Sequence, residues 1–191
     1  MSSIATREPR RHRLTVEDYY RMGETGILAP DARVELIDGE IIDMPPIGSR
    51  HAGTVNQLTS ILVRAAGAQA IVQVQNPIVL GSFSAPQPDF AVLRPRADFY
   101  KSRLPEPGDV LLLVEVAHAS LRHDRDTKTL LYARHAIPEL WLVDVRAKRL
   151  VRYRDARQGA YALVDRPDLR APLEIAELPD VRVDLRKLFG R

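Results

Sequence analysis

The chain has 191 residues, of which 45% are hydrophobic and 28% charged, a composition typical of one globular domain with some extension. It contains no cysteine, which excludes disulfides, thiolate zinc sites, iron–sulfur clusters and cysteine nucleophiles and fits a cytoplasmic location. The net charge of +3 is compatible with a nucleic-acid partner but does not indicate one.

The N-terminus carries four arginines within residues 1–13 and no apolar segment behind them, so it does not match a secretory signal. No stretch approaches the roughly 18 apolar residues that a membrane span needs, and no membrane partner is expected. We expect residues 1–13 to form a flexible basic arm and residues 14–191 to form a single domain.

The first half of the chain predicts two helices and a β-hairpin. The helices are expected over residues 16–22 and 50–66, and the hairpin over residues 33–43. Asp38 and Gly39 separate two apolar runs, which is a strong signal for a two-residue hairpin turn. Thr15 and Ser49 are candidate N-caps of the two helices, and Gly67 is a candidate end of the second.

The second half predicts several strands and one further helix. The strands are expected over residues 70–80, 88–93, 110–116, 139–144, 149–154 and 160–164, and the helix over 124–135. Strand 110–116, the helix and strand 139–144 form a βαβ unit, which predicts a parallel pair joined by a right-handed crossover. The last two strands flank a turn at Gly159 and predict a peripheral hairpin. The pattern indicates an α/β fold with a mixed central sheet flanked by helices.

Two acidic residues occupy unusual positions. Glu115 is the only charge in the apolar run 110–117, and Asp89 follows Pro88 at the start of a short strand. A buried carboxylate costs several kcal/mol unless it is paired, protonated or bound to a cation. Glu115 could instead reach solvent or an arginine at the strand end, and Asp89 could cap a turn. If the two strands end side by side, the two acids provide oxygen ligands of the kind that Mg²⁺ prefers.

A lysine follows these acids on the next predicted helix. Asp124, Lys128 and Tyr132 are spaced by four residues and therefore share one helical face. An Asp–Lys pair in solvent is one explanation of this spacing. Alternatively, a lysine in the first turns of this helix leans over Glu115. Two metal-binding acids and a lysine suit phosphodiester hydrolysis, because a cation polarises the phosphate and an ammonium orients water or neutralises developing charge.

On these residues the chain resembles the PD-(D/E)XK nuclease superfamily, and within it a large bacterial branch of restriction-endonuclease-like proteins. The matching segments are VELIDGEI (34–41), Arg50-His51, QPDFAVLRP (87–95), residues 111–144 and VRVDLRKLF (181–189). The resemblance implies a restriction-endonuclease-like fold with an added hairpin, and Mg²⁺, or alternatively Mn²⁺, as cofactor. It also implies DNA as substrate and a homodimer as the active form.

Carried over by position, the resemblance makes Asp89 and Glu115 metal ligands, with the main-chain carbonyl of Val116 as a further ligand. Lys128 would position the attacking water. In the commonest superfamily pattern the lysine lies two residues after the glutamate, where this chain has Ala117, and the branch moves the lysine to the helix. The resemblance gives supporting roles to Glu35, His51, Ser120, Asp124 and Tyr132. Glu35 could instead face outward from the hairpin, and His51 could instead be a capping or surface residue.

Other chemistries are less well supported by the sequence. His118, Ser120, His123 and Asp124 lie together, but a serine hydrolase usually takes its triad from separate elements and there is no G-x-S-x-G motif. No glycine-rich nucleotide-binding motif is present, so no nucleotide cofactor is expected. The main alternative to a Mg²⁺-dependent DNA endonuclease is a catalytically inactive nucleic-acid-binding or protein-binding module on the same fold.

Two sets of arginines are candidates for DNA contact. Arg152 and Arg154 share one face of the late hairpin, by strand alternation. Arg122 and Arg125 lie beside the proposed site at the start of the helix. Solubilising charge on an edge hairpin is the simpler explanation of the first pair, because Lys and Arg also protect sheet edges from aggregation.

Overall fold

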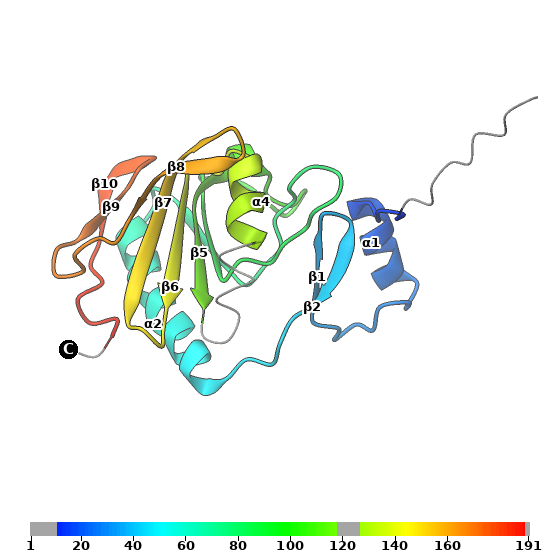
Figure 1. The fold of residues 1–191 in the computed structure, drawn as a ribbon, viewed down its shortest axis with the longest axis horizontal. Helices are drawn as coiled ribbons and strands as arrows, with labels where there is room; N and C mark the ends of the chain where they lie inside the picture. The colour runs from blue at the N-terminus through cyan, green and yellow to red at the C-terminus, as the bar shows by residue number, and fades with distance from the viewer. Residues whose placement is uncertain (1–10, 118–126, 190–191) are drawn as a thin grey trace, which may run out of the picture.

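The computed structural model describes residues 11–117 and 127–189 (Figure 1). Its elements in chain order are α1 (Val16–Glu24), β1 (Val34–Ile37), β2 (Glu40–Asp43), α2 (Ser49–Ala66), β3 (Ile71–Val74), β4 (Phe90–Leu93), the 3₁₀ turn η1 (Pro107–Asp109), β5 (Val110–Ala117), α4 (Thr129–Arg134), β6 (Glu139–Asp144), β7 (Arg149–Arg157), β8 (Ala160–Asp165), β9 (Leu173–Ile175) and β10 (Leu178–Val183). The predicted hairpin, helices and strands are confirmed, several with shifted bounds. The hairpin of β9 and β10 was not predicted. Most of the expected N-terminal arm, residues 1–10, lies outside the described residues.

Six strands form one mixed sheet in the order β3-β4-β5-β6-β7-β8. β5 and β6 run parallel, from Leu113 opposite Leu140 to Ala117 opposite Asp144, and the other neighbours are antiparallel. This confirms the predicted mixed α/β sheet and its parallel pair. The late hairpin of β7 and β8 forms one edge of this sheet rather than a separate unit (Figure 1). β3 forms the other edge.

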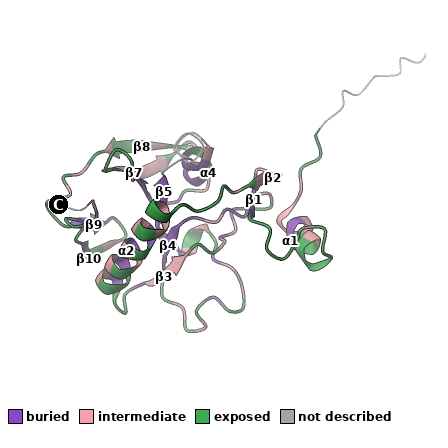
Figure 2. Cartoon of the chain, turned by 90° about the horizontal axis from the view of Figure 1, so that it is seen from below, coloured by how far each residue is buried: buried purple, intermediate pink, exposed green. Residues whose placement is uncertain are grey.

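Apolar side chains cover both faces of the sheet, so its central strands are buried throughout (Figure 2). On one face, Leu58 of α2 packs with Val114 and Trp141 and with the β9–β10 hairpin. On the other face, Tyr132 of α4 packs with Leu113 and Leu142. Alternate residues of a strand point to opposite faces, so Glu115, between Leu113 and Ala117 of the α4-face cluster in the regular part of β5, points to the α4 face.

The α2 face contains one buried acid. Glu139 is fully buried, and its carboxylate accepts hydrogen bonds from the Trp141 indole at 2.6 Å and from the main-chain N–H of Ala176 at 2.7 Å. Burial raises the pKa of Glu139 above its ordinary value, and these hydrogen bonds oppose that rise. The hydrogen bonds tie β6 to the β9–β10 hairpin and so hold the C-terminal segment against the sheet.

α1 and the β1–β2 hairpin pack together beside the main sheet, around Tyr19 and Leu36 (Figure 1). The hairpin turn uses two left-handed residues, with φ of 51° at Asp38 and 84° at Gly39, as a two-residue turn of this kind requires. A Cβ atom at position 39 would lie 2.6 Å from the Cβ of Arg13, so the close approach of the two chain segments also requires glycine.

The helix starts follow the predictions only in part. The Thr15 hydroxyl accepts from the N–H of Asp18 at 3.1 Å, and the Asp18 carboxylate accepts from the N–H of Thr15 at 2.9 Å, which confirms Thr15 as the cap of α1. α2 instead begins at Ser49, with Gly48 as its N-cap and no side-chain hydrogen bond to it. The cap assigned to Ser49 was therefore wrong by one residue.

The predicted helix over 124–135 is α-helical over Thr129–Arg134, with Lys128 at its N-cap position, whereas residues 118–126 lie outside the described residues. None of the helices within residues 11–117 and 127–189 has both the length and the apolar character that crossing a membrane requires.

Candidate active site

The register of β4 and β5 brings Asp89 and Glu115 to the same end of neighbouring strands. Phe90 lies opposite Val114 in this antiparallel pair, so the next positions along, 89 and 115, lie opposite each other. The main-chain N–H of Val116 donates to Asp89 Oδ2 at 2.8 Å, which fixes the carboxylate of Asp89 against β5. The two acids singled out in the sequence thus come together through sheet pairing.

The carboxylate of Asp89 is held by contacts from three elements. His51 Nε2, in the first turn of α2, lies 3.0 Å from Asp89 Oδ1. The Gln75 side-chain amide, just after β3, donates to the same oxygen at 3.0 Å. Gln75 has a φ of 49°, a left-handed conformation that is uncommon for a residue with a side chain. Together with the Val116 N–H, these contacts hold Asp89 in one orientation while 12% of its side chain stays exposed.

Lys128 lies between two buried glutamates. Its Nζ is 3.0 Å from Glu35 Oε2 and 3.3 Å from Glu115 Oε1, and all three side chains are at most 5% exposed. The Tyr132 hydroxyl donates to Glu115 Oε1 at 2.6 Å, and the main-chain N–H of Gln87 donates to Glu35 Oε2 at 3.1 Å. The lysine charge is therefore directed at the carboxylates and not at solvent, and Glu35 faces inward.

The cluster suits a hard divalent cation by its donor chemistry. Among the described residues it contains three carboxylates and one ammonium in mutual contact or on facing strand positions. Mg²⁺ is commonly bound by one or two carboxylates and keeps several water molecules. Within residues 11–117 and 127–189, no three His, Cys, Asp or Glu side chains are arranged to hold a metal ion. A cation at this place would therefore depend on Asp89 and Glu115, completed by main-chain oxygen and water.

The arginines proposed for DNA contact are not part of this cluster. Arg152 and Arg154 share one face of β7, as predicted, but they line a cavity with residues of the β9–β10 hairpin, on the α2 face. Arg152 binds the carboxylate of Asp165 through two nitrogens, at 3.0 and 2.8 Å. The other proposed residues of the connection, Ser120, Arg122, Asp124 and Arg125, lie outside the described residues.

Two further residues of the cluster were missed by the sequence reasoning. Gln75 holds Asp89 with its side chain, and Gln87 holds Glu35 with its main-chain N–H. Polar residues at strand ends are common, and only the register of β3 with β4, which places position 75 opposite 89, shows that Gln75 belongs to the site. No local pattern could have identified either residue.

Comparison with known proteins relates the chain to one family and to solved structures, and finds no curated relative. The profile of the Uma2 family, described as "Putative restriction endonuclease", matches residues 16–186. A solved structure described as "a putative nuclease belonging to DUF820" from Anabaena variabilis ATCC 29413 has a TM-score of 0.69 and 16% sequence identity, over 93% of this chain and 98% of that chain. At this identity the likeness shows a shared fold. No curated protein matches the chain.

Proposed function

Because the chain belongs to the Uma2 family of putative restriction endonucleases, we propose that it is a metal-dependent endonuclease that hydrolyses DNA phosphodiester bonds. The observation that carries the proposal is the contact of the buried Lys128 ammonium with Glu115, which lies opposite Asp89 on the neighbouring strand. Buried carboxylates and a buried ammonium are costly to the fold, and a module that only binds has no need of them.

In this proposal Asp89 and Glu115 hold Mg²⁺ or Mn²⁺, with the carbonyl of Val116 as a further ligand. The bound cation supplies Lewis-acid polarisation of the scissile phosphate and a lowered pKa for a bound water. The Lys128 ammonium orients the attacking water and neutralises negative charge that develops on the phosphate. Its position is set from both sides, by Glu35 at 3.0 Å and by Glu115 at 3.3 Å.

The surrounding residues act by holding these groups in place. Tyr132 restrains Glu115 through its 2.6 Å hydrogen bond, and His51 and Gln75 restrain Asp89 at 3.0 Å each. Carboxylates that are fixed in advance need no reorganisation when they bind a cation, which favours both affinity and rate. His51 and Tyr132 are thus positioning residues in this mechanism.

The test is cleavage of plasmid and linear DNA by the wild type and by Asp89→Asn, with Mg²⁺, with Mn²⁺ and with a chelator. Asp31→Asn, an exposed position in the loop before β1, is the matched control. We expect the wild type and the control to cleave only with a divalent cation, and Asp89→Asn to lose cleavage. Cleavage that persists in Asp89→Asn, or in chelator, would contradict the proposal.

The main alternative is a module that binds nucleic acid or protein without cleaving. It predicts that the wild type binds without cutting any of a panel of single-stranded and duplex DNA and RNA substrates. We also propose that the active form is a homodimer, because cutting both strands of a duplex requires two sites. Sedimentation velocity of the wild type would show this directly, and a monomer at micromolar concentration with full duplex cleavage would contradict it.

A further inference from the structure

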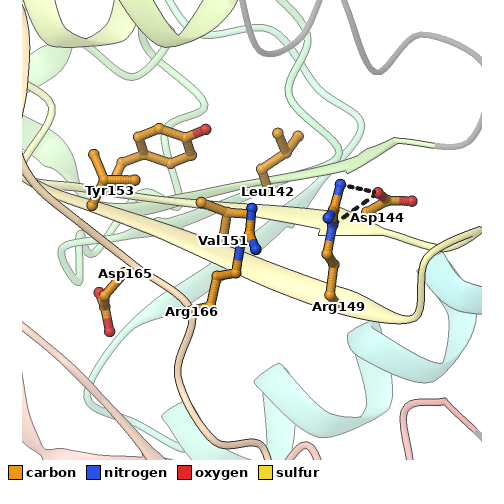
Figure 3. Close-up of a pocket in the computed structure, with 8 residues that line it drawn as sticks. Leu142, Asp144, Arg149, Val151, Tyr153, Asp165 and Arg166 are labelled. Atoms are coloured by element: carbon orange, nitrogen blue, oxygen red, sulfur yellow. Dashed lines mark hydrogen bonds and ion pairs between the residues drawn. The ribbon is translucent and has the colours of Figure 1, made fainter.

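A cavity of about 490 Å³ opens over β6, β7 and the end of β8 (Figure 3). Leu142, Val151 and Tyr153 form its apolar floor, and Arg149 and Arg166 contribute its positive charges. None of these residues belongs to the proposed catalytic cluster. We refer to it as the arginine cavity.

The arginine cavity lies on the same face of the sheet as the carboxylates. In the parallel β5–β6 pair, Leu142 lies opposite Glu115 and Asp144 lies opposite Ala117. Leu142 also packs in the same apolar layer as Tyr132, which binds Glu115. Neighbouring strands are about 4.8 Å apart, so β7 lies roughly 10 Å from β5. That separation corresponds to about three nucleotides of axial rise along a DNA strand.

The two arginines of this cavity are presented differently. Arg149 is anchored by the carboxylate of Asp144, through Nε at 3.2 Å and Nη2 at 3.1 Å, and its side chain stays 43% exposed. A guanidinium has five N–H donors, so this anchor leaves donors for a ligand. Arg166 is exposed, and no ion pair of its side chain is found among the described residues.

The acidic residues of the cavity do not cancel this charge. Asp144 is nearly buried beneath Arg149, with 6% of its side chain exposed. The carboxylate of Asp165 points away from Arg149 and Arg166 (Figure 3) and is bound by Arg152 on the opposite face. The open side of the cavity therefore combines two guanidinium groups with an apolar floor.

We propose that the arginine cavity binds a sugar-phosphate unit of the DNA strand, a few nucleotides from the bond that is cut. The inference rests on the proposed nuclease function. Guanidinium groups bind phosphate oxygens in a forked geometry, which suits Arg149 and Arg166. The apolar floor of Leu142, Val151 and Tyr153 suits the hydrophobic face of a deoxyribose. Such contacts fix the register of the strand over the carboxylates and carry no sequence information.

The primary test variant is Arg166→Gln, because no ion pair among the described residues is broken by it. Arg64→Gln, on α2 over the opposite face, has the same change of charge and is the matched control. Binding of short single-stranded and duplex DNA is measured by fluorescence anisotropy in chelator over a range of salt. We expect Arg166→Gln to bind about tenfold more weakly at low salt, and the salt dependence of log K to fall by about one unit. Arg64→Gln should match the wild type.

Arg149→Gln provides a second variant, with unfolding measured in parallel because Arg149 also pairs with the buried Asp144. A further probe is a duplex in which the linkages near the cleaved bond are neutral methylphosphonates. It distinguishes phosphate binding in the arginine cavity from nonspecific electrostatic attraction between the protein and DNA. That substitution should weaken binding by the wild type more than binding by Arg166→Gln, which retains only Arg149 in the cavity. Inorganic phosphate should compete only at concentrations far above the Kd for DNA, because a free ion lacks the sugar contact.

The outcomes separate the two proposals. If the wild type cleaves DNA and Arg166→Gln and Arg149→Gln both bind as tightly as Arg64→Gln, the cavity assignment is overturned and the nuclease stands. If the variants lose binding but the wild type cuts no substrate, the cavity binds nucleic acid and the nuclease proposal fails. If the wild type neither binds nor cuts DNA, both fail.

Discussion

Replacing Lys128 by methionine removes the one described ammonium between Glu35 and Glu115 while keeping a side chain of similar volume. At 3.0 and 3.3 Å, each ion pair is worth about 5 kcal/mol of gross attraction at an effective dielectric constant of 20. Much of this attraction offsets the cost of burying the three groups. Removing one member of a buried ion pair typically lowers the free energy of unfolding by about 3–5 kcal/mol.

Proton uptake reduces this loss. In Lys128→Met, one of the two glutamates can become protonated instead of remaining charged and uncompensated. At pH 7 this costs about 3.7 kcal/mol, because pH 7 lies roughly 2.7 units above the reference pKa of glutamic acid. We therefore expect a loss of about 3–4 kcal/mol at pH 7, smaller by about 1.4 kcal/mol at pH 6.

Urea unfolding followed by tryptophan fluorescence measures this loss, because Trp141 is the only tryptophan of the chain and is fully buried in the sheet. Lys101→Met, at an exposed position, is the matched control and should stay within about 0.5 kcal/mol of the wild type. Adding Glu35→Gln to Lys128→Met should recover at least about 1 kcal/mol, because one of the two uncompensated charges is then absent. A loss below about 0.5 kcal/mol at pH 7, or a loss that does not shrink at pH 6, would refute this reasoning.

Three further predictions concern single positions. Tyr132→Phe removes the 2.6 Å hydrogen bond to Glu115. In steady-state cleavage assays we expect kcat to fall up to about tenfold with KM unchanged. An unchanged kcat would show that this hydrogen bond does not position the carboxylate. Gly39→Ala places a Cβ atom 2.6 Å from the Cβ of Arg13, at a residue whose φ is 84°. The free energy of unfolding should therefore fall by at least about 1 kcal/mol. A loss below about 0.5 kcal/mol would contradict the turn geometry. Because burial raises the pKa of Glu139 in the folded protein, its contribution to stability is complete below its ordinary value of 4.5 and is lost as the pH rises through the folded pKa. Urea unfolding should therefore show the wild type losing stability relative to Glu139→Gln as the pH rises above 4.5, and parallel pH profiles would exclude this effect.

The fold could be predicted to a large extent, because most of its elements have local patterns. Asp38 and Gly39 identify the hairpin turn, and the apolar run around Glu115 identifies the central strand. The β9–β10 hairpin was missed because β9 has only three residues, Leu173–Ile175, too few to show an alternation. Its identity as a hairpin depends on packing against α2 and on the contact of Glu139 with Ala176, which no local pattern contains.

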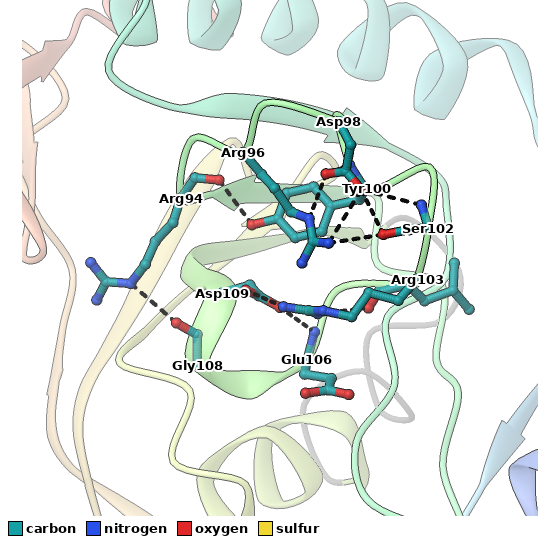
Figure 4. Close-up of polar contacts among 10 residues, drawn as sticks. Arg94, Arg96, Asp98, Tyr100, Ser102, Arg103, Glu106, Gly108 and Asp109 are labelled. Atoms are coloured by element: carbon teal, nitrogen blue, oxygen red, sulfur yellow. Dashed lines mark hydrogen bonds and ion pairs between the residues drawn. The ribbon is translucent and has the colours of Figure 1, made fainter.

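The connection between β4 and β5 shows the same limit (Figure 4). Its prolines predict only a loop, yet the loop is held by a set of polar contacts at irregular spacing. Arg103 binds Asp109 through two nitrogens, at 2.6 and 2.9 Å, and the Tyr100 hydroxyl donates to the main-chain oxygen of Arg94 at 2.8 Å. Pairings of this kind depend on how the chain folds back on itself, so they cannot be derived from periodicity.

The candidate site could be predicted where a charged residue occurs in a segment that is otherwise apolar. A single charge in an apolar run identified Glu115. The start of the next helix just past that strand, together with the family resemblance, identified Lys128 as a candidate neighbour. Glu35 remained ambiguous, because an outward-facing position on the hairpin was an equal reading, and only its 3.0 Å contact with Lys128 shows that it faces inward. Gln75 depends on the pairing of three strands, and sheet register is a property of the assembled fold.

The contacts of Lys128 also determine when the cluster can form during synthesis of the chain. Glu35 precedes Lys128 by 93 residues, and Asp89 and Glu115 come between them. When the N-terminal hairpin is complete during synthesis, the chain does not yet contain Lys128. Strand β6, which pairs with β5, is synthesised later still. Contacts between residues so distant in sequence form late, because the intervening chain must first close. The cluster is thus a product of completed folding, and a truncated or nascent chain that ends before α4 has no means of assembling it.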